Sequence, residues 1–375
     1  MASRRGEVAR GPAATVQPFP ARRATSRDVA AAAGVSQATV SNVINHPEKV
    51  TAATRDAVLI SMAELHFVVH GPARLLRAGQ ATTIGLCVPD LSNPFWGEVT
   101  RGASAAAAQH GSALLVCSSE ESPAQEVDLL RVLERQRVAG VLIAPVEPDL
   151  EPLDRLTQRG TPVVLLNRHD PRRRLPSAAV DDVAGGMLVG EHLLSLGHRR
   201  IAVVNGGQSI SWCADRWDGI RQSVQEAGLD PQKVLHEVPV ETQRASEGER
   251  VAAAIRAITP RVTAVFCVND LLALGLLRGL TQLNVRVPED ISLVGYDDDD
   301  FTEMLLPSLT TVRQEPYRLG HFACARLLLG AESGERLVAT AAGVRAPFQT
   351  RLIVRESVRR RTERESAARV AAAVP

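Results

Sequence analysis

The chain has 375 residues, of which 45% are hydrophobic and 23% charged, and its formal net charge is +1. This composition is typical of a soluble globular protein of two or three domains and excludes an intrinsically disordered chain. No stretch reaches the roughly 18 consecutive apolar residues of a membrane helix, and the N-terminus lacks the apolar segment of a secretory signal. The five cysteines are scattered, which fits a reducing compartment. We therefore expect a cytoplasmic protein without membrane contact.

The charge is distributed unevenly along the chain. Residues 1–79 carry a net charge of +5, residues 80–355 carry −6 and residues 356–375 carry +2. A basic N-terminal segment on a nearly neutral protein favours contact with nucleic acid at that end alone.

The basic segment has the pattern of a small helical domain. Thr25 or Ser26 can cap a first helix, Gly34 can end it in a left-handed conformation, and Ser36 can cap a second helix after a very short turn. Thr51 can cap a third helix. Two short helices joined by a tight turn are typical of a helix-turn-helix, whose second helix enters the major groove of DNA. A helical domain that binds protein is the alternative.

The polar residues of these helices fall into two groups by the DNA contacts expected of them. Residues at the N-terminal end of the second helix are placed to read base edges, and they are Gln37, Ala38, Ser41 and Asn42. Other residues would lie beside phosphates and fix the register on DNA, and they are Arg27, Thr39, Thr54 and Arg55.

From residue 83 onward, short apolar runs alternate with helical segments. The runs that predict strands are 83–88, 113–117, 140–144, 162–166, 201–204, 264–268 and 291–295. A strand at 309–313, a helix at 316–329 and a strand at 348–354 complete the pattern. This alternation predicts an α/β fold with parallel sheets covered by helices on both faces. Its length predicts two doubly wound lobes.

Several motifs in colinear order resemble the lactose-repressor (LacI/GalR) family of bacterial transcription regulators. The head contributes Asp28-Val29-Ala30, Ala33-Gly34-Val35-Ser36, Thr39-Val40-Ser41 and Asn45. The body contributes Ile84-Gly85-Leu86, PDLSNPFW (89–96), LGHRRI (196–201), Asn269-Asp270, DISLVGYDD (290–298) and PSLTTV (307–312). The resemblance covers about residues 25–355. It implies a homodimeric regulator, expected to be a repressor associated with the nucleoid, that binds double-stranded operator DNA and is controlled by a small effector.

The resemblance also implies a hinge helix after the head, with Leu76 as a wedge in the minor groove. Two departures stand out: Pro72 fits only in the first turn of that helix, and Asn42 stands where many members carry a guanine-reading arginine. The full set expected to contact DNA is Thr25, Arg27, Ser36, Gln37, Ala38, Thr39, Ser41, Asn42, Asn45, Thr54, Arg55, Ala73 and Leu76. Dimerisation could use the first body helix, through Ala103, Ala106, Ala107 and His110.

The expected division of the chain follows from these patterns. The parts are a disordered extension (1–23), a helix-turn-helix domain (24–67), a hinge helix (68–80), a two-lobed effector-binding body (81–355) and a disordered tail (356–375).

The effector site is expected in the loops after the strands, because ligands of parallel α/β sheets bind at the carboxyl ends of the strands. Six of the 12 aromatic residues lie in or beside these loops, which favours a platform for a sugar or a base; they are Phe95, Trp96, Trp212, Trp217, Phe266 and Tyr296. The candidate contact residues are Phe95, Trp96, Asn167, Arg168, Arg216, Asn269, Asp270 and Asp297. By the resemblance, Arg216 and Asp297 are the leading ones.

Each candidate also has a purely structural alternative. Asn269 and Asp270 could cap the following helix, and Trp212 and Trp217 could pack on the helix they begin. Most of the aspartates in the run 297–300 are expected to be solvated, so we assign no metal and no cofactor.

The sequence lacks the common catalytic motifs. It contains no GxGxxG or GxxxxGK[ST] phosphate loop, no GxSxG elbow and no zinc-spaced His/Cys cluster, so no enzyme is expected. A sugar is the effector class implied by the resemblance, with a nucleobase or nucleoside as the alternative. A solute-binding protein without a regulatory role would share the body but lack the DNA-binding head.

Overall fold

The computed structural model describes residues 24–67, 83–147, 149–172, 174–207, 210–333 and 348–361. The chain divides into two units, a head that extends to Gln80 and a body that begins at Ala81. The predicted extension 1–23 and the predicted hinge helix 68–80, with Ala73 and Leu76, lie outside the described residues.

The head is a three-helix domain with caps at the predicted residues. Its elements are α1 (Ser26–Ala32), α2 (Gln37–Asn45), the 3-10 turn η1 (Pro47–Lys49) and α3 (Ala52–Glu64). Thr25, Ser36 and Thr51 each accept the backbone N–H of the residue three positions on, and Gly34 has φ +66°. A small core fixes the helices, made of Val29, Ala30, Val40, Val43 and Val58. The predicted helix-turn-helix is therefore confirmed.

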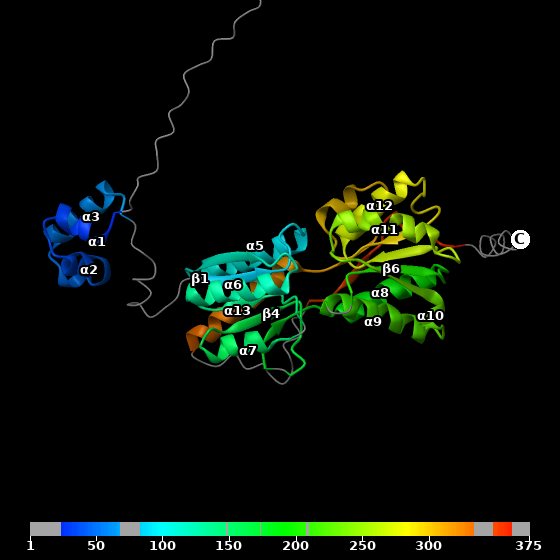
Figure 1. Ribbon diagram of the computed structural model, residues 1–375, viewed down its shortest axis with the longest axis horizontal. Coiled ribbons are helices and arrows are strands. Elements are labelled where there is room, and N and C mark those ends of the chain that lie inside the picture. The colour runs from blue at the N-terminus through cyan, green and yellow to red at the C-terminus, as the bar shows by residue number, and fades with distance from the viewer. Residues whose placement is uncertain are drawn as a thin grey trace, which may run out of the picture. The chain divides into compact units, whose positions relative to one another are not determined.

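The body has two lobes, each built around a parallel sheet (Figure 1). The elements of the N-terminal lobe are β1 (Thr83–Val88), α5 (Pro94–Gln109), β2 (Ala113–Ser118), α6 (Pro123–Arg135), β3 (Val141–Ile143), α7 (Glu151–Gln158), β4 (Val163–Leu166) and β5 (Ser177–Ala178). Helix α13 (Pro316–Ser333) returns to this lobe and packs on α5. The strand order is β2-β1-β3-β4-β5.

The C-terminal lobe repeats this plan. Its elements are α8 (Asp182–Ser195), β6 (Ile201–Asn205), α9 (Ser211–Glu226), α10 (Pro231–Val234), β7 (Leu235–Pro239), α11 (Ala245–Ala257), β8 (Ala264–Cys267), α12 (Asp270–Gln282), β9 (Ser292–Val294) and η2 (Asp300–Met304). The strand order is β7-β6-β8-β9, and β10 (Thr311–Arg313) pairs antiparallel with β11 (Arg351–Ile353) in a separate ribbon. The predicted α/β class with two doubly wound lobes is confirmed.

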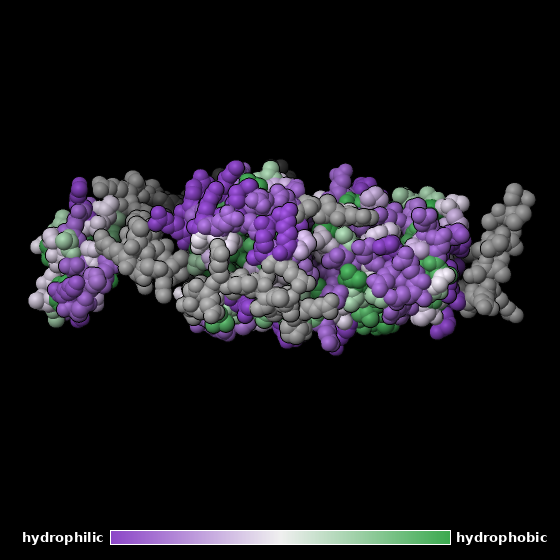
Figure 2. All heavy atoms as spheres, turned by 90° about the horizontal axis from the view of Figure 1, so that it is seen from below, coloured by the Kyte–Doolittle hydropathy of each residue, from purple (hydrophilic) through white to green (hydrophobic). Residues whose placement is uncertain are grey.

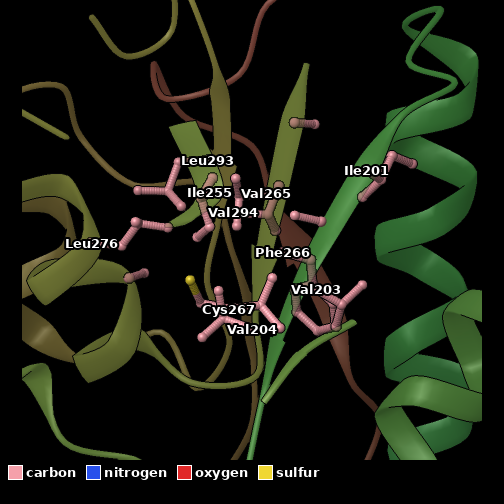
Figure 3. Close-up of a cluster of buried hydrophobic side chains, with 14 of the residues drawn as sticks. Ile201, Val203, Val204, Ile255, Val265, Phe266, Cys267, Leu276, Leu293 and Val294 are labelled. Carbon is pink, nitrogen blue, oxygen red and sulfur yellow. The ribbon is translucent and has the colours of Figure 1, made fainter. Parts of the chain in front are cut away.

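The strands are apolar because helices cover both faces of each sheet. In β1, Ile84, Leu86 and Val88 belong to one core cluster, whereas Cys87 belongs to another on the opposite face. Figure 3 shows the core of the C-terminal lobe, where β6, β8 and β9 contribute most of the labelled side chains. On the face drawn in Figure 2, hydrophilic side chains predominate among the coloured residues.

Glycines allow the helices that cover the sheets to approach closely. A Cβ at Gly102 of α5 would lie 1.9 Å from the carbonyl oxygen of Tyr317 in α13, and one at Gly219 of α9 would lie 2.0 Å from that of Val183 in α8. Any larger residue would force these helix pairs apart.

Three expectations need correction. Ala103, Ala106 and Ala107 are buried at 1% exposure or less in the core of the N-terminal lobe, because this face of α5 packs on α13. They are therefore unavailable for dimerisation, whereas His110 is exposed. The aspartate run is mostly not solvated, since Asp298 pairs with Arg313 and Arg355 and only Asp300 is exposed.

The third correction concerns the tail predicted to be disordered from residue 356. Residues 356–361 instead pack on the C-terminal lobe. Ser357 is 1% exposed, and its backbone carbonyl accepts the N–H of Leu293 in β9. Arg361 donates its N–H to Leu196. Although charged residues are frequent in this segment, its backbone extends the hydrogen bonding of the lobe.

Two strands escaped the prediction, and both lie at the edge of their sheet. β5 has only two residues, and in β7 only Leu235 and Val238 are buried, so neither shows a continuous apolar run. None of the described helices is long and apolar enough to cross a membrane.

Candidate functional site

The first candidate site is the surface at the start of α2. Gln37 and Ala38 are exposed there, and Ser41 and Asn42 are half-buried, while Val40 on the opposite face lies in the core. The helix therefore presents the predicted base-reading residues away from the core of the head. Arg27 and Arg55 are also exposed.

Several other predicted DNA contacts hold the head together. The hydroxyls of Ser36 and Thr39 lie 2.9 Å apart, and so do those of Thr51 and Thr54. Thr25 forms a capping box with Asp28, and Asn45 donates its side-chain amide to the Ser41 carbonyl oxygen at 2.7 Å. These bonds satisfy backbone groups at the helix ends and within α2, so the roles are at least structural.

The second candidate site lies at the carboxyl ends of the strands in the body. Its centre is Arg216 of α9, which is only 2% exposed. The guanidinium donates to Asp182 Oδ1 at 2.9 Å and to the carbonyl oxygen of Val268, and it lies 3.7 Å from Asp297 Oδ1. The Arg216 guanidinium carbon also lies 3.6 Å from the centre of the Tyr296 ring.

Burial governs the ionisation of this cluster. Loss of water raises the pKa of Asp182 and of Asp297, and the charge of Arg216 opposes the rise in both. Opposing charges at this depth are stable only together, because a single buried charge without its partner is strongly unfavourable.

Asn269 has the helix-capping role that was the alternative for both residues, whereas the Asp270 carboxylate is held by other bonds. Asn269 caps α12 by accepting the N–H of Leu272 at 2.9 Å, and its amide donates to the Gln243 carbonyl oxygen. Asp270 is 0% exposed, and its two carboxylate oxygens accept bonds from Thr311 and Asp299. We therefore drop Asp270 from the proposed effector contacts.

The aromatic candidates are also largely buried. Phe95 and Trp96 are each 4% exposed and meet edge to face, with ring centres 4.9 Å apart, in the core of the N-terminal lobe. Trp212 and Trp217 pack against the core of the C-terminal lobe. Arg168 donates to the Glu147 carbonyl oxygen, and burial lowers the pKa of its guanidinium.

Four uncharged amide side chains at the strand ends each have a buried polar atom without a hydrogen-bond partner among the described residues. These atoms are Asn167 Oδ1 after β4, Asn205 Oδ1 at the end of β6, Gln243 Nε2 after β7 and Gln314 Oε1 after β10. All four side chains are 5% exposed or less.

One of these amides is bonded to the arginine cluster. Gln314 donates to Asp297 Oδ1 at 2.6 Å, whereas Asn205 donates to Glu237 and it is the backbone carbonyl oxygen of Gln243 that accepts the Asn269 amide. Sequence reasoning named only Asn167 of the four. Asn205 could have been found by the same rule, because it directly follows the predicted strand 201–204, whereas Gln243 follows β7, which was not predicted.

Backbone strain gathers in the same loops. Asn167 has φ +49° and Asp297 has φ +119°, while Glu120 and Glu121 after β2 have φ +49° and +57°. Residues with side chains rarely adopt these values, and such strain often occurs at ligand sites.

Comparisons with known proteins agree with this organisation. Residues 25–69 match the family described as "Bacterial regulatory proteins, lacI family", and residues 191–358 match the "Periplasmic binding protein-like domain". The repressor PurR of Photobacterium profundum is 33% identical over 307 residues, which cover 81% of this chain and 91% of that protein.

Solved structures extend the similarity to the fold. A LacI-family regulator of Enterococcus faecium with bound ribose is 28% identical, with a TM-score of 0.67 over 75% of this chain and 100% of that one. The lac repressor dimer bound to operator and an anti-inducer is 26% identical, with a TM-score of 0.72 over 90% of this chain and 100% of that one. With a DNA-binding head and a two-lobed body, this chain belongs to the lacI family of bacterial regulatory proteins and is a DNA-binding transcriptional regulator.

Proposed function

We propose that the protein is a dimeric repressor that binds a pseudopalindromic operator and is controlled by a small, uncharged, hydroxylated effector between its lobes. A sugar is the class that fits best. The regulator acts on nucleoid DNA in the cytoplasm and catalyses no reaction. Heads of two protomers are needed, because a single helix in one half-site makes too few contacts for tight specific binding.

The observation that carries the effector class is the set of four buried amides with unpaired atoms. A buried donor or acceptor without a partner costs about 1–3 kcal/mol, so a ligand rich in hydroxyls would relieve several such costs at once. The charges at the site are already paired, since Arg216 is bonded to Asp182 and lies near Asp297. Both features favour a neutral ligand over a charged one.

The same site fits a nucleobase or nucleoside less well. Stacking a base needs an accessible aromatic face. Phe95, Trp96 and Tyr296 are each 4% exposed or less. The half-buried Trp212 already has the Arg216 guanidinium over its ring, 4.8 Å from the ring centre. The E. faecium relative with bound ribose also supports a sugar.

The DNA contacts proposed on the head are Gln37, Ala38, Ser41 and Asn42 for base edges, with Arg27 and Arg55 for phosphates. The contribution of the hinge through Ala73 and Leu76 remains part of this proposal. Within the effector site, Asn167, Arg216, Asp297 and the newly recognised Asn205, Gln243 and Gln314 are the proposed contact set, with Phe95, Trp96, Arg168 and Asn269 supporting it.

A ligand screen on the full-length protein tests the effector class. We expect a thermal-shift response to D-ribose or another sugar, confirmed by calorimetry, and none to nucleosides or nucleobases. Gln314→Ala should then weaken sugar binding at least about tenfold, which corresponds to ~1.4 kcal/mol. Gln282→Ala is the matched control, because this glutamine lies exposed on α12 and bonds Glu249 away from the site. A response to nucleosides alone, or equal loss in both variants, would contradict the proposal.

A further inference from the structure

Two lobes that are joined by the chain along one side also touch on the other. Arg244, in the segment between β7 and α11, donates from Nε to Asp90 Oδ2 at 3.1 Å and from Nη2 to Glu120 Oε2 at 2.6 Å. Asp90 follows β1 and Glu120 follows β2, so one arginine of the C-terminal lobe holds two carboxylates of the N-terminal lobe.

A further carboxylate lies at this contact. Glu121, next to Glu120, has its Oε2 buried without a hydrogen-bond partner among the described residues, and the backbone of Gln243 and the charge of Arg244 oppose the rise in its pKa that burial causes. Glu120 and Glu121 both have left-handed backbone conformations, at φ +49° and +57°. Residues with side chains hold such conformations only where their surroundings fix them. The two carboxylates are thus presented to the other lobe by a strained turn.

The strand order places these contacts far from the connections between the lobes. The chain leaves the N-terminal lobe after β5 and leaves the C-terminal lobe after β10, which is bridged to the β9 side of the sheet. Strands β5 and β9 are edge strands, and β2 and β7 are the opposite edges of their sheets. Among the described residues, the contacts of Arg244 therefore join the lobes on the side opposite these connections.

The Asp90 carboxylate is also held by its own lobe. Its Oδ1 accepts the N–H of Ser92 at 2.8 Å, and its side chain is 7% exposed, whereas those of Arg244 and Glu120 are 43% and 49% exposed. A carboxylate that is already held loses little conformational entropy when it pairs, so the bond of Arg244 to Asp90 contributes more than its bond to the exposed Glu120.

We propose that Arg244, with Asp90 and Glu120, forms a latch that fastens the open side of the body over the effector. Arg244 is a positioning residue, because it sets how long the effector stays bound by holding the lobes together. The inference rests on the proposed function only in placing the effector between the lobes. Arg244 directly follows Gln243, whose side chain belongs to the proposed site, so the latch and the site are neighbours along the chain.

Hydrogen exchange of the full-length protein without any ligand tests the latch directly. Opening of the lobes removes the contact that holds the segments around Glu120 and Arg244 against each other, so exchange of their backbone amides reports how often the latch is undone. In Arg244→Ala and in Glu120→Gln we expect exchange of peptides spanning 118–122 and 241–244 to accelerate at least about threefold. The two variants remove the same contact from opposite lobes, so a folding defect peculiar to one of them would not reproduce the effect.

Arg221→Ala is the matched control. Arg221 also holds a carboxylate through two hydrogen bonds, but its partner Asp218 lies on the same helix, α9. Its exchange at both peptides should equal that of the unchanged protein. Unchanged exchange in both Arg244→Ala and Glu120→Gln, or equal acceleration in Arg221→Ala, would overturn the latch.

Dissociation of a bound sugar gives the functional readout, with D-ribose as the first probe. Loss of the latch should speed dissociation about three- to tenfold while association changes little, as is common for contacts that hold a complex closed. Equal dissociation rates in the Arg244→Ala and unchanged proteins would refute the role in effector retention. If no sugar binds at all, the proposed function fails, whereas the exchange experiment still decides whether the latch exists.

Discussion

The head and the body of this protein use polar side chains in opposite ways. In the head, the residues proposed to read DNA lie on the outer face of α2, opposite a core made of Val29, Ala30, Val40, Val43 and Val58. In the body, the proposed effector contacts are buried, and Arg216 and Asp297 are also part of what holds the lobe together. Substitution of a DNA contact in the head should therefore change DNA binding but not stability, whereas substitution of a buried effector contact in the body should change both effector binding and stability.

The largest expected effect tests the body half of this comparison. Arg216→Ala leaves Asp182 and Asp297 buried without their cation, so the free energy of unfolding of the body should fall by about 3–5 kcal/mol. Urea unfolding followed by tryptophan fluorescence measures it, since all three tryptophans (Trp96, Trp212 and Trp217) lie in the body.

The control for that variant lies on the same helix. Arg221 of α9 is 45% exposed and pairs with Asp218 one turn away, so Arg221→Ala should cost less than about 1 kcal/mol. If Arg216→Ala were as mild as Arg221→Ala, the buried cluster would not stabilise the lobe and the contrast with the head would collapse.

A smaller effect tests the head half. Gln37→Ala should reduce discrimination at one operator base pair by about 1–3 kcal/mol, because a side-chain amide can bond adenine in two places. The stability of the head should change by no more than about 0.5 kcal/mol, since the side chain is exposed. Fluorescence anisotropy on operator variants selected from a random DNA pool measures the first, and thermal unfolding the second.

Arg55→Ala provides the contrast within the head. A phosphate contact carries no sequence information, so this variant should weaken binding to all sites alike and reduce the salt dependence by about one counterion. A loss of discrimination in Arg55→Ala, or uniform weakening in Gln37→Ala, would reverse the assignments.

The smallest expected effect concerns pH and sharpens the picture of the body. Burial, together with the nearby charges of Asp90 and Glu120, raises the pKa of Glu121 to about 7, although the Gln243 N–H and Arg244 oppose the rise. The charge of Glu121 in turn contributes to the raised pKa of the buried Cys213 thiol, whose largest cause is burial. With the lobes apart, the carboxyl would return toward its ordinary pKa of 4.5.

The sign of the pH effect follows from that difference. The fastened lobes hold the Glu121 proton more tightly than the separated lobes do. Protonation of Glu121 therefore favours the fastened state, and this stabilisation is fully present below pH 4.5 and is lost as pH rises through 7. Effector affinity should be about tenfold higher at pH 6 than at pH 8, or ~1.4 kcal/mol. Binding of a sugar measured across this range should depend on pH in the unchanged protein and be flat in Glu121→Gln. Asp90 titrates in the opposite sense, because hydrogen bonds from Ser92 and the charge of Arg244 lower its pKa against the effect of burial. Its contribution to effector affinity therefore changes at a more acidic pH than that of Glu121.

The sequence by itself determined the features that depend on neighbours along the chain. The caps at Thr25, Ser36 and Thr51 bond a backbone group three residues away, and the turn at Gly34 needs only its own left-handed conformation. Alternating apolar and helical segments determined the two parallel sheets, because a strand buried on both faces must be apolar throughout.

Only the tertiary structure decided which polar residues act together. Arg216 meets Asp182 across 34 residues, and Arg244 meets Asp90 across 154. No local pattern encodes such pairs, since they arise when two lobes and their sheets bring distant loops together. The same holds for Ala103 and for residues 356–361, whose burial depends on α13 and β9, elements supplied from elsewhere in the chain. The sequence shows which residues are charged or polar, whereas the tertiary structure is needed to show which of them pair and which are buried.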